Sequence, residues 1–460
     1  MADLSQQFIT DSEKKVADQN HRATIQHNIE KYNAAVVSGK EQYARLDLAR
    51  SRAAGLRNRV IENLDKYLIE FESNFIKRVG KVIWAQDAAE ANREILALLK
   101  ARGVTEVVKS KSMVTEEIHL NAALKKEGIA SVETDLGEFI QQTHGEAPYH
   151  IVTPAMHKSK EDVAKLYSDK LGAPSGMTPE EVTTWTRNHL RKNFRSAQAG
   201  ITGANFLIAE TGSVAITENE GNAWMSVASP KLHIVVAGIE KIIPSLTDLD
   251  IFWPLLATFG TGQKISAYNS IISGPKNNGT DSGPEEMFVV LIDNGRTNVL
   301  AQTEQRKALS CIRCGACLNA CPVYEAVGGH TYSAVYSGPI GSVLMQYMQP
   351  DSGYKHLSYA TTSCAKCTES CPVNIEIHKL LLYNRKDNAS HGPTSKTENM
   401  MWFFWKGAMM KRSNMDKGGA KLKNFMLRQF FRKSWGDQRE LPSVAPKSFN
   451  QYWRERKGIK

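Results

Sequence analysis

The stretch that decides the fold reads Cys311-Ile-Arg-Cys314-Gly-Ala-Cys317-Leu-Asn-Ala-Cys321-Pro322. Its spacing is the C-x2-C-x2-C-x3-C-P run that is typical of bacterial iron–sulfur proteins. Three thiolates separated by two residues on a tight loop can reach three corners of one iron–sulfur cubane. The fourth thiolate, which the chain carries away just before the proline, points towards a second cluster. The stretch therefore predicts a domain built around iron–sulfur clusters.

A second block repeats this pattern in shortened form and reads Cys364-Ala-Lys-Cys367-Thr-Glu-Ser-Cys371-Pro372. Thr361 occupies the place of its missing first cysteine, and all seven cysteines of the chain lie in the two blocks. The spacing predicts interleaved clusters, in which the last cysteine of each block binds the cluster of the other block. The expected ligands are Cys311, Cys314, Cys317 and Cys371 for the first cluster, and Cys321, Cys364 and Cys367 for the second.

Zinc is the main alternative, because paired C-x2-C motifs also form zinc sites. A structural zinc takes four ligands and does not account for a longer block that recurs, so iron–sulfur clusters are favoured. The second cluster lacks one cysteine, and it is either a three-iron form or a cubane whose fourth iron takes another ligand. His330 is the first candidate for that ligand and Thr361 the second. An open iron that binds a small molecule is a further alternative.

The composition of the 460 residues is that of a globular protein of two or three domains, with 42% hydrophobic and 23% charged residues. No run is long enough to span a bilayer. The N-terminal Met-Ala-Asp-Leu-Ser-Gln-Gln lacks the basic and apolar segments of a secretory signal. Clustered cysteines of the cofactor type fit a reducing compartment. We therefore expect a cytoplasmic protein that is at most peripheral to the inner face of the membrane.

The net charge of +10 is diffuse, and basic residues become denser towards the C-terminus. No helix-turn-helix, finger or base-stacking motif accompanies them, so nucleic acid is not an expected partner. Residues 391–460 combine these basic residues with aromatic ones, as in Trp402-Phe-Phe-Trp405. We expect a basic helical tail that packs on the protein or on a partner subunit. Contact with an anionic membrane surface is the alternative.

Residues 1–78 are polar and rich in helix formers, and apolar residues recur at three- and four-residue steps between Leu56 and Phe75. This pattern predicts a helix packed on the next domain, in preference to a coiled-coil partner helix. Residues 79–300 alternate β-branched runs with helical stretches, which predicts a parallel α/β sheet. Residues 301–390 form the expected two-cluster domain. Strands are expected at 82–84, 104–108, 129–132, 150–153, 206–209, 213–217, 233–237 and 287–292, with 213–217 continuing the same sheet.

Glu210, Thr211 and His233 are the residues of the α/β domain that we consider for catalysis. Glu210 ends an expected strand at a turn, which is a common place for a functional carboxylate. The favoured alternative is that Glu210-Thr-Gly forms a hairpin turn and that His233 opens a strand, so the catalytic residues stay unknown. The sequence holds no Gly-x-Gly-x-x-Gly dinucleotide loop and no P-loop. The fingerprint of a self-contained dehydrogenase is therefore absent.

The α/β part also resembles a known family. The segments concerned are Gly203-Ala-Asn-Phe-Leu-Ile-Ala-Glu210-Thr211-Gly212, Pro230-Lys-Leu-His233 and Ile242-Ile-Pro244. They are similar to the lactate-utilisation (LUD) domain. Together with the cysteine blocks, Gly328-Gly-His330 and Gly338-Pro-Ile-Gly341, they resemble the iron–sulfur subunit of the bacterial L-lactate utilisation system (LutB/LldF type). The resemblance implies a sheet like that of NagB/RpiA sugar-phosphate isomerases and CoA transferases, followed by an α-helical ferredoxin-type domain.

The resemblance implies a role as well. It implies an electron-transfer subunit of an L-lactate oxidising complex, which relays electrons from lactate oxidation through two 4Fe-4S clusters. The implied partners are a cysteine-rich subunit and a smaller LUD-domain subunit, and the electron acceptor stays open. One alternative is an oxidoreductase whose LUD domain itself binds the carboxylate substrate. Another alternative is an iron–sulfur sensor or scaffold.

Overall fold

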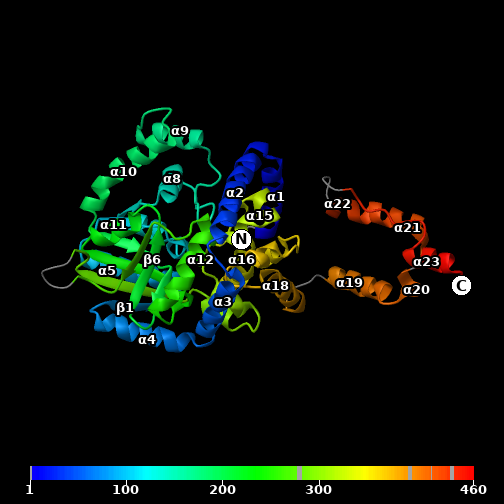
Figure 1. Cartoon of the computed structure of the whole chain (residues 1–460). Coiled ribbons are helices and arrows are strands. Elements are labelled where there is room, and N and C mark those ends of the chain that lie inside the picture. Colours follow the sequence, from blue (N-terminus) through cyan, green and yellow to red (C-terminus); the bar gives the residue numbers. More distant parts are fainter. Residues whose placement is uncertain (1–2, 277–281, 392–395, 416, 436–439, 460) are drawn as a thin grey trace. The chain divides into compact units, whose positions relative to one another are not determined.

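The computed structural model describes residues 3–276, 282–391, 396–415, 417–435 and 440–459 (Figure 1). The chain divides into two compact units, Met1–Asn388 and Ala389–Lys460. The first unit holds a parallel sheet, a smaller sheet and a helical region that contains both cysteine blocks. The second unit holds helices alone among its described residues. An α/β domain followed by a helical domain was expected, and this fold class is confirmed.

The main sheet of the first unit has six strands, all parallel, in the order β1-β10-β7-β4-β2-β3. The two long central strands β10 and β7 are almost entirely buried, as their continuous apolar runs predict for a sheet covered on both faces. The strands are β1 Lys81–Ala85, β2 Glu106–Lys109, β3 Ala130–Glu133, β4 Ala199–Thr202, β7 Leu232–Gly238 and β10 Glu286–Ile292.

Each face of this sheet packs on a different layer. Ile234 and Val236 of β7 point to a core that is completed by the helices α5 Ala88–Ala101, α6 Met113–Glu117 and α7 Leu120–Lys126. Val235 and Ala237 point to the opposite core, which contains α4 Leu64–Lys77 and the smaller sheet. The further helices of this region are α8 Leu136–His144, α9 Lys160–Leu171, α10 Pro179–Ser196 and α11 Asn222–Ala228.

The smaller sheet has the order β8-β5-β6-β9, and β5 and β6 form an antiparallel hairpin within it. Residues 213–217 were expected to continue the main sheet, and this expectation is wrong. Only residues 203–205 connect β4 to β5, whereas a parallel crossover needs a dozen or more residues. The chain therefore leaves the main sheet. The strands are β5 Phe206–Ile208, β6 Ser213–Glu218, β8 Ile242–Ile243 and β9 Tyr268–Ile272.

The strand expected at 150–153 is absent, because this segment is irregular. The Nδ1 atom of His150 accepts hydrogen bonds from the backbone N–H groups of Val152 (3.1 Å) and Thr153 (3.2 Å). Such a local side-chain acceptor competes with strand pairing. The segment instead meets the helical region, where the Tyr324 hydroxyl donates to the Tyr149 carbonyl at 2.9 Å.

The cysteine blocks lie between short helices, as expected for a ferredoxin-type domain. Its core continues into the N-terminal helix α2 Gln19–Lys40 and into α12 Leu249–Thr261. Gly338-Pro-Ile-Gly341 forms the first turn of α16. The helices are α13 Arg296–Leu300, α14 Ala316–Asn319, α15 Pro322–Val327, α16 Gly338–Met348, α17 Lys366–Glu369 and α18 Ile377–His391, and the 3-10 helices Gln305–Ser310 and Tyr354–Tyr359 precede the two blocks.

The N-terminal region is helical, with α1 Leu4–Ala17, α2, α3 Leu46–Glu62 and α4. The expected apolar stripe is buried, but it is shared between α3 and α4, which are separated at Asn63. Arg57 of α3 is 1% exposed and joins the domains. Its guanidinium donates to four backbone carbonyls, those of Glu240 (2.5 Å), Ile242 (2.6 Å), Leu309 (3.0 Å) and Ser310 (3.2 Å).

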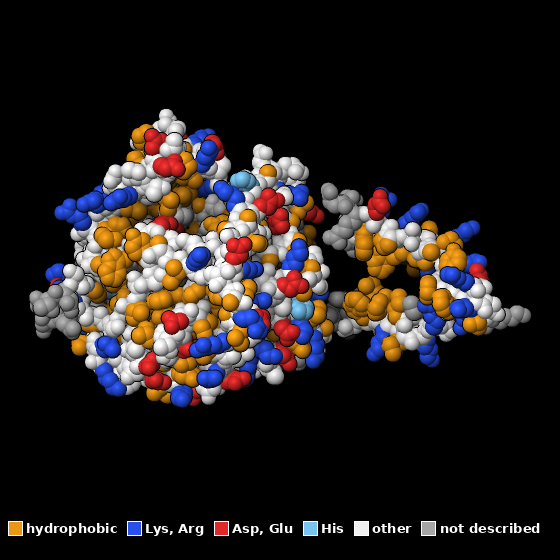
Figure 2. Space-filling model, in the orientation of Figure 1, with side chains coloured by type: hydrophobic (Ala, Val, Ile, Leu, Met, Phe, Trp, Pro, Cys, Tyr) orange, Lys and Arg blue, Asp and Glu red, His pale blue; other side chains and the backbone are white. Residues whose placement is uncertain are grey.

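The second unit begins with α18 residues and continues with helices whose large apolar side chains are exposed. Figure 2 shows hydrophobic and basic side chains together over this unit. Four consecutive exposed aromatic side chains are Trp402, Phe403, Phe404 and Trp405 of α19 Lys396–Met409. The remaining helices are α20 Arg412–Met415, α21 Gly419–Met426, α22 Arg432–Trp435 and α23 Phe449–Lys457. Among the described residues, none of the helices combines the length and the apolar character needed to cross a membrane.

Candidate functional site

The two cysteine blocks follow the same backbone path at an interval of 50 residues. Arg313 (φ +62°) corresponds to Ser363 (φ +57°), and Gly315 (φ +79°) corresponds to Ala365 (φ +64°). The left-handed region is rare for residues other than glycine, so its use at both positions of both blocks marks a shared loop geometry. A one-turn helix, α14 or α17, then follows each loop. The shortened block is therefore a structural repeat as well as a sequence repeat.

Thr361 takes the structural position of Cys311. In the first block, the backbone N–H of Arg313 donates to the Cys311 Sγ at 3.3 Å. In the second block, the backbone N–H of Ser363 donates to the Thr361 Oγ1 at 3.0 Å. A hydroxyl oxygen thus lies where the repeat would place a sulfur atom.

The thiols form two groups that cross between the blocks. Burial raises the pKa of Cys317, and the nearby charges of Cys311, Cys314 and Cys371 raise it further. The same four cysteines line one small cavity. Burial also raises the pKa of Cys367 to about 11, with further contributions from Cys321 and Cys364.

The two groups differ in exposure. In the first group, Cys314, Cys317 and Cys371 are buried. In the second group, Cys364 is exposed, and hydrogen bonds from Thr362 and from the Lys366 backbone lower its pKa. The first group therefore lies inside the protein, whereas the second reaches the surface.

The residues present fit iron–sulfur clusters. All seven cysteines are free thiols, which are soft ligands suited to such clusters when deprotonated. Peptide N–H groups also reach the sulfurs, as at Ile375, whose N–H donates to the Cys371 Sγ at 3.3 Å. Donors of this kind tune the reduction potential of a cluster. The structure thus supplies both the ligands and their surroundings.

His330, the first candidate for the missing ligand, lies in a different group. Its Nε2 is 2.8 Å from the carbonyl oxygen of Ala147. Its ring contacts Tyr149 and His157, and ligand atoms of His330, His157 and Glu146 lie within 4.8 Å of one another. These contacts tie His330 to the α/β domain. Burial is the main cause that lowers its pKa, and the charges that act on it most are those of Glu146, Lys15 and Lys158.

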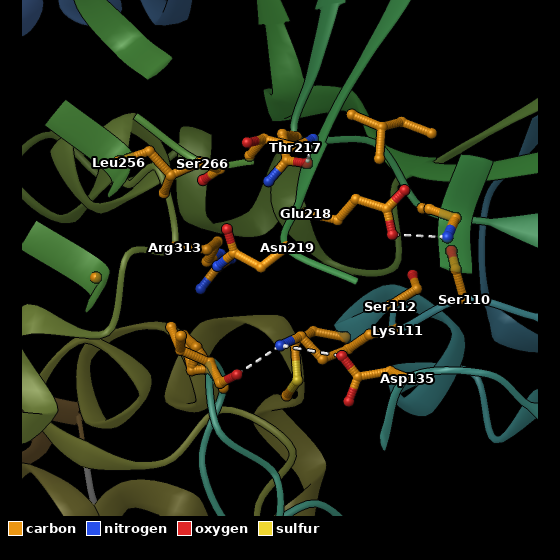
Figure 3. Close-up of a pocket in the computed structure, with 18 of the residues that line it drawn as sticks. Ser110, Lys111, Ser112, Asp135, Thr217, Glu218, Asn219, Leu256, Ser266 and Arg313 are labelled. Carbon is orange, nitrogen blue, oxygen red and sulfur yellow. Dashed lines mark hydrogen bonds and ion pairs between the residues drawn. The ribbon is translucent and has the colours of Figure 1, made fainter. Parts of the chain in front are cut away.

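A cavity of about 380 Å³ opens at the carboxyl ends of the parallel strands (Figure 3). It is bounded by the loops that follow β2, β3, β4 and β7, by the end of β6 and by the first cysteine block. The carboxyl ends of the strands are the usual ligand-binding edge of an open α/β sheet. Its volume is within the range of small-molecule sites. The cavity is therefore the candidate binding site of the α/β domain.

One side of the cavity is acidic (Figure 3). Glu218 accepts hydrogen bonds from the N–H groups of Ala223 (2.7 Å) and Trp224 (2.8 Å), so its carboxylate caps α11. Lys111 Nζ donates to the Val152 carbonyl at 2.5 Å and lies 3.9 Å from Asp135 Oδ2. The charged groups on this side therefore have partners within the protein.

The side next to Cys314 is basic. Lys241 is 8% exposed, and its ammonium makes no hydrogen bond or ion pair with any described residue. Arg313 stacks on Tyr336, with 4.1 Å between the guanidinium carbon and the ring centroid. The Arg313 Nη2 lies 3.4 Å from the Glu240 Oε1, whereas its Nη1 is buried without a hydrogen-bond partner among the described residues. Lys241 and Arg313 thus both line the cavity, and each has a nitrogen without a hydrogen-bond partner among the described residues.

The residues considered for catalysis do not line this cavity. Glu210 is exposed and accepts hydrogen bonds from the Ser245 hydroxyl (2.6 Å) and the Leu246 N–H (3.0 Å). Thr211 donates through its hydroxyl to Ser213 at 2.9 Å. These contacts belong to the hairpin turn that was the favoured alternative.

His233 is fully buried in β7. Its Nε2 lies 2.9 Å from the Thr202 hydroxyl, and burial lowers its pKa to about 3. The residues that sequence reasoning missed are Lys111, Lys241 and Arg313. Lys111 and Lys241 come shortly after β2 and β7, so the rule about the carboxyl ends of strands could have found them. Arg313 lies inside a cysteine block, where the spacing of the cysteines gives no signal for the role of an intervening arginine.

Family models match both domains. Residues 68–292 match the LUD domain, and residues 307–375 match a 4Fe-4S dicluster domain. The class of protein is therefore a LUD domain joined to an iron–sulfur domain, and the cofactors are 4Fe-4S-type clusters.

Curated relatives match nearly the whole chain. Lactate utilization protein B of Shouchella clausii is 40% identical over 457 residues, 96% of each chain. Lactate utilization protein B of Anoxybacillus flavithermus is 41% identical over 422 residues, 88% of this chain and 89% of its own. An Escherichia coli relative described as the uncharacterized electron transport protein YkgF is 39% identical over 421 residues, 88% of this chain and 87% of its own. The chain belongs to the lactate utilization protein B family.

Proposed function

We propose that the protein is the iron–sulfur electron-transfer subunit of an L-lactate oxidising system. Oxidation of lactate to pyruvate releases two electrons, and two 4Fe-4S clusters in one small domain would pass them on singly. The observation that carries this proposal is the pair of crossed thiol groups in a helical domain. The substrate is suggested by the printed names of the relatives, lactate utilization protein B.

Each thiol group corresponds to one cluster in this proposal. Cys311, Cys314, Cys317 and Cys371 hold the first cluster, and Cys321, Cys364 and Cys367 hold the second. Thr361 would lie nearest the fourth iron of the second cluster, because the Thr361 Oγ1 accepts the same backbone hydrogen bond as the Cys311 Sγ. The contacts of His330 with Ala147, Tyr149 and His157 speak against its role as that ligand.

In this proposal each part of the chain has its own role. Residues 79–300 form the LUD domain, residues 301–390 the cluster domain, residues 1–78 a helical brace and residues 391–460 a docking tail. The exposed aromatic side chains of α19 support a tail that binds a partner subunit. A cysteine-rich subunit and a small LUD-domain subunit are the proposed partners, at the cytoplasmic side of the membrane. Direct contact of the tail with lipid is the alternative.

Anaerobic purification tests the proposal. Two cubanes require about eight irons and eight sulfides per chain, with two interacting EPR signals after reduction. About seven irons with a three-iron signal in the oxidised protein would show an incomplete second cluster. Zinc in place of iron would overturn the proposal. Pull-down of the tagged chain from the native bacterium, with and without residues 391–460, tests the docking tail.

A second candidate function is an oxidoreductase whose LUD domain binds the carboxylate itself. The cavity at the carboxyl ends of the strands, with its basic side next to Cys314, favours this candidate. L-lactate should then bleach the clusters of the purified single chain. If bleaching needs the partner subunits, the chain is a carrier alone.

A further inference from the structure

We propose that the basic side of the LUD cavity binds a small carboxylate, of the hydroxy- or oxo-acid type, directly against the first cluster. The inference deepens the proposed function and rests on the assignment of Cys314 to that cluster. Lys241 and Arg313 would hold the carboxylate. Both side chains and Cys314 line the same cavity, so ligand and cluster would share one wall.

The basic side of the cavity carries a positive charge that has no partner among the described residues. Lys241 is a buried residue that lines the cavity, and its ammonium makes no hydrogen bond or ion pair among the described residues. The carboxylate of the preceding residue, Glu240, already accepts from Arg296 Nε at 2.5 Å and lies 3.4 Å from Arg313 Nη2. Buried charges in proteins are normally paired. An anion in the cavity would supply the partner that Lys241 lacks.

Arg296 binds Glu240, so the Glu240 carboxylate is not free to pair with Lys241. Its guanidinium is fully buried between Glu240 and Glu117, with Nη1 and Nη2 each 2.8 Å from a Glu117 oxygen. The Tyr336 hydroxyl donates to Glu117 at 2.6 Å and fixes the ring on which Arg313 stacks. This network holds Arg313 in place. Arg313 Nη1, which is buried without a hydrogen-bond partner among the described residues, would be the second donor of the site.

A carboxylate fits this pair of donors better than a spherical anion. The two oxygens of a carboxylate can accept from two separate cations, here Arg313 Nη1 and the Lys241 ammonium, because Arg313 Nη2 already faces Glu240. The remaining cavity is lined in part by the hydroxyls of Ser110 and Ser112, which suit a ligand with a further oxygen (Figure 3). Lactate and pyruvate belong to this chemical class.

Binding next to a cluster should change its reduction potential. An added negative charge opposes reduction, so a carboxylate should bind more tightly when the first cluster is oxidised. By linkage, tenfold tighter binding to the oxidised form lowers the midpoint potential by about 59 mV for a one-electron couple. The second cluster, held by another thiol group, should shift less.

The test uses anaerobically purified full-length protein with its clusters assembled. Calorimetry with pyruvate or L-lactate should show saturable binding, and EPR-monitored redox titration should show a negative shift of one cluster. Lys241→Met should weaken pyruvate binding at least tenfold, and Lys241→Arg should restore part of it. Lys231→Met is the matched control, because Lys231 is 79% exposed on the same domain. Its binding should equal that of the unaltered chain.

The outcomes separate this inference from the proposed function. Low iron and sulfide contents would defeat the proposed function before any ligand is added. Full clusters without saturable binding of pyruvate or L-lactate would overturn the inference alone. Binding of pyruvate that is equally tight in the Lys241→Met variant would also overturn the inference. The same holds if Lys241→Met shifts the reduction potential of the first cluster but pyruvate does not shift that potential in the unaltered chain. Inorganic phosphate bound as tightly as pyruvate would overturn the choice of a carboxylate.

Discussion

The two cysteine blocks share one backbone path and differ in what surrounds it. In the first block, Ile312 and Ala316 are buried, and Arg313 reaches into the LUD cavity. In the second block, the corresponding Thr362 and Lys366 are exposed. The repeat therefore fixes the geometry of the ligands, and the surrounding domain decides what each cluster meets. The first cluster would face the LUD domain, and the second would face solvent or a partner.

Two arginines of helix α3, Arg57 and Arg50, bind backbone carbonyls next to the two cysteine blocks, and we call them the braces. Arg57 donates to the carbonyls of Leu309 and Ser310, just before the first block. Arg50, two turns earlier in α3, donates to the carbonyls of Glu369 (2.9 Å) and Cys371 (2.7 Å) at the end of the second block. Arg57 is buried, whereas Arg50 is half-buried. The brace of the first block is therefore more buried than that of the second, and the effect of removing each brace on the free energy of unfolding can be compared.

Replacing a buried cysteine should have the largest effect. Cys317→Ser removes a buried thiolate of the first group, and metal binding contributes to the free energy of folding. We expect loss of the first cluster and destabilisation by at least about 3 kcal/mol. Cys364→Ser removes an exposed ligand, so we expect the smaller destabilisation of the two although the second cluster is lost as well. Anaerobic urea unfolding and iron counts measure both effects.

Equal destabilisation by the two serine variants would show that exposure does not separate the blocks. A variant that keeps its full iron content would show that the replaced cysteine is not a ligand.

Removing the braces should have the next largest effect. Arg57→Met leaves four buried carbonyls without their donor, which should destabilise the first unit by about 3 kcal/mol or more. Arg50→Met removes the donor of two carbonyls at a half-buried position and should cost about 1 kcal/mol. Urea unfolding of the two variants gives the comparison directly. A larger cost for Arg50→Met would contradict the order of burial.

The left-handed positions offer a matched pair of smaller changes. A Cβ at Gly315 would lie 3.0 Å from Val152 Cγ2 and 3.1 Å from His150 Cε1, at a φ of +79°. Gly315→Ala should therefore cost about 1–3 kcal/mol. Ala365→Gly removes the strain of an alanine at φ +64° and should stabilise by up to about 1 kcal/mol. Differential unfolding in urea should show opposite signs for the two variants. Equal signs would mean that the two loops are not equivalent.

The sequence predicted the cofactor and the fold class because both depend on local patterns. Thiol spacing is a short-range signal, and alternating strands and helices indicate a parallel sheet. The strand expected at 150–153 failed because the His150 side chain accepts local backbone hydrogen bonds. Residues 213–217 left the main sheet because the connection before β5 is too short for a crossover.

The LUD cavity could not be predicted in the same way. Lys241 and Arg313 are 72 positions apart, and their shared cavity depends on how the cysteine domain packs on the sheet. No periodicity in the sequence encodes that packing. The glutamate at 210 was a reasonable candidate by its place after a strand, but β5 belongs to the smaller sheet and ends away from the cavity.

The substitution with the smallest expected effect on stability compares the ligand sets of the two blocks directly. Thr361→Cys places a thiol where the repeat already directs the Ser363 N–H, and Thr361 is only half-buried. We expect a change in stability within about 0.5 kcal/mol, because surface substitutions without strain are nearly neutral. The iron content of the second cluster should become resistant to mild oxidation, since a fourth thiolate would hold the iron for which the unaltered chain offers only Thr361. EPR of the air-exposed protein measures this as loss of the three-iron signal. Thr362→Cys, one position away and exposed, is the matched control and should leave that signal unchanged.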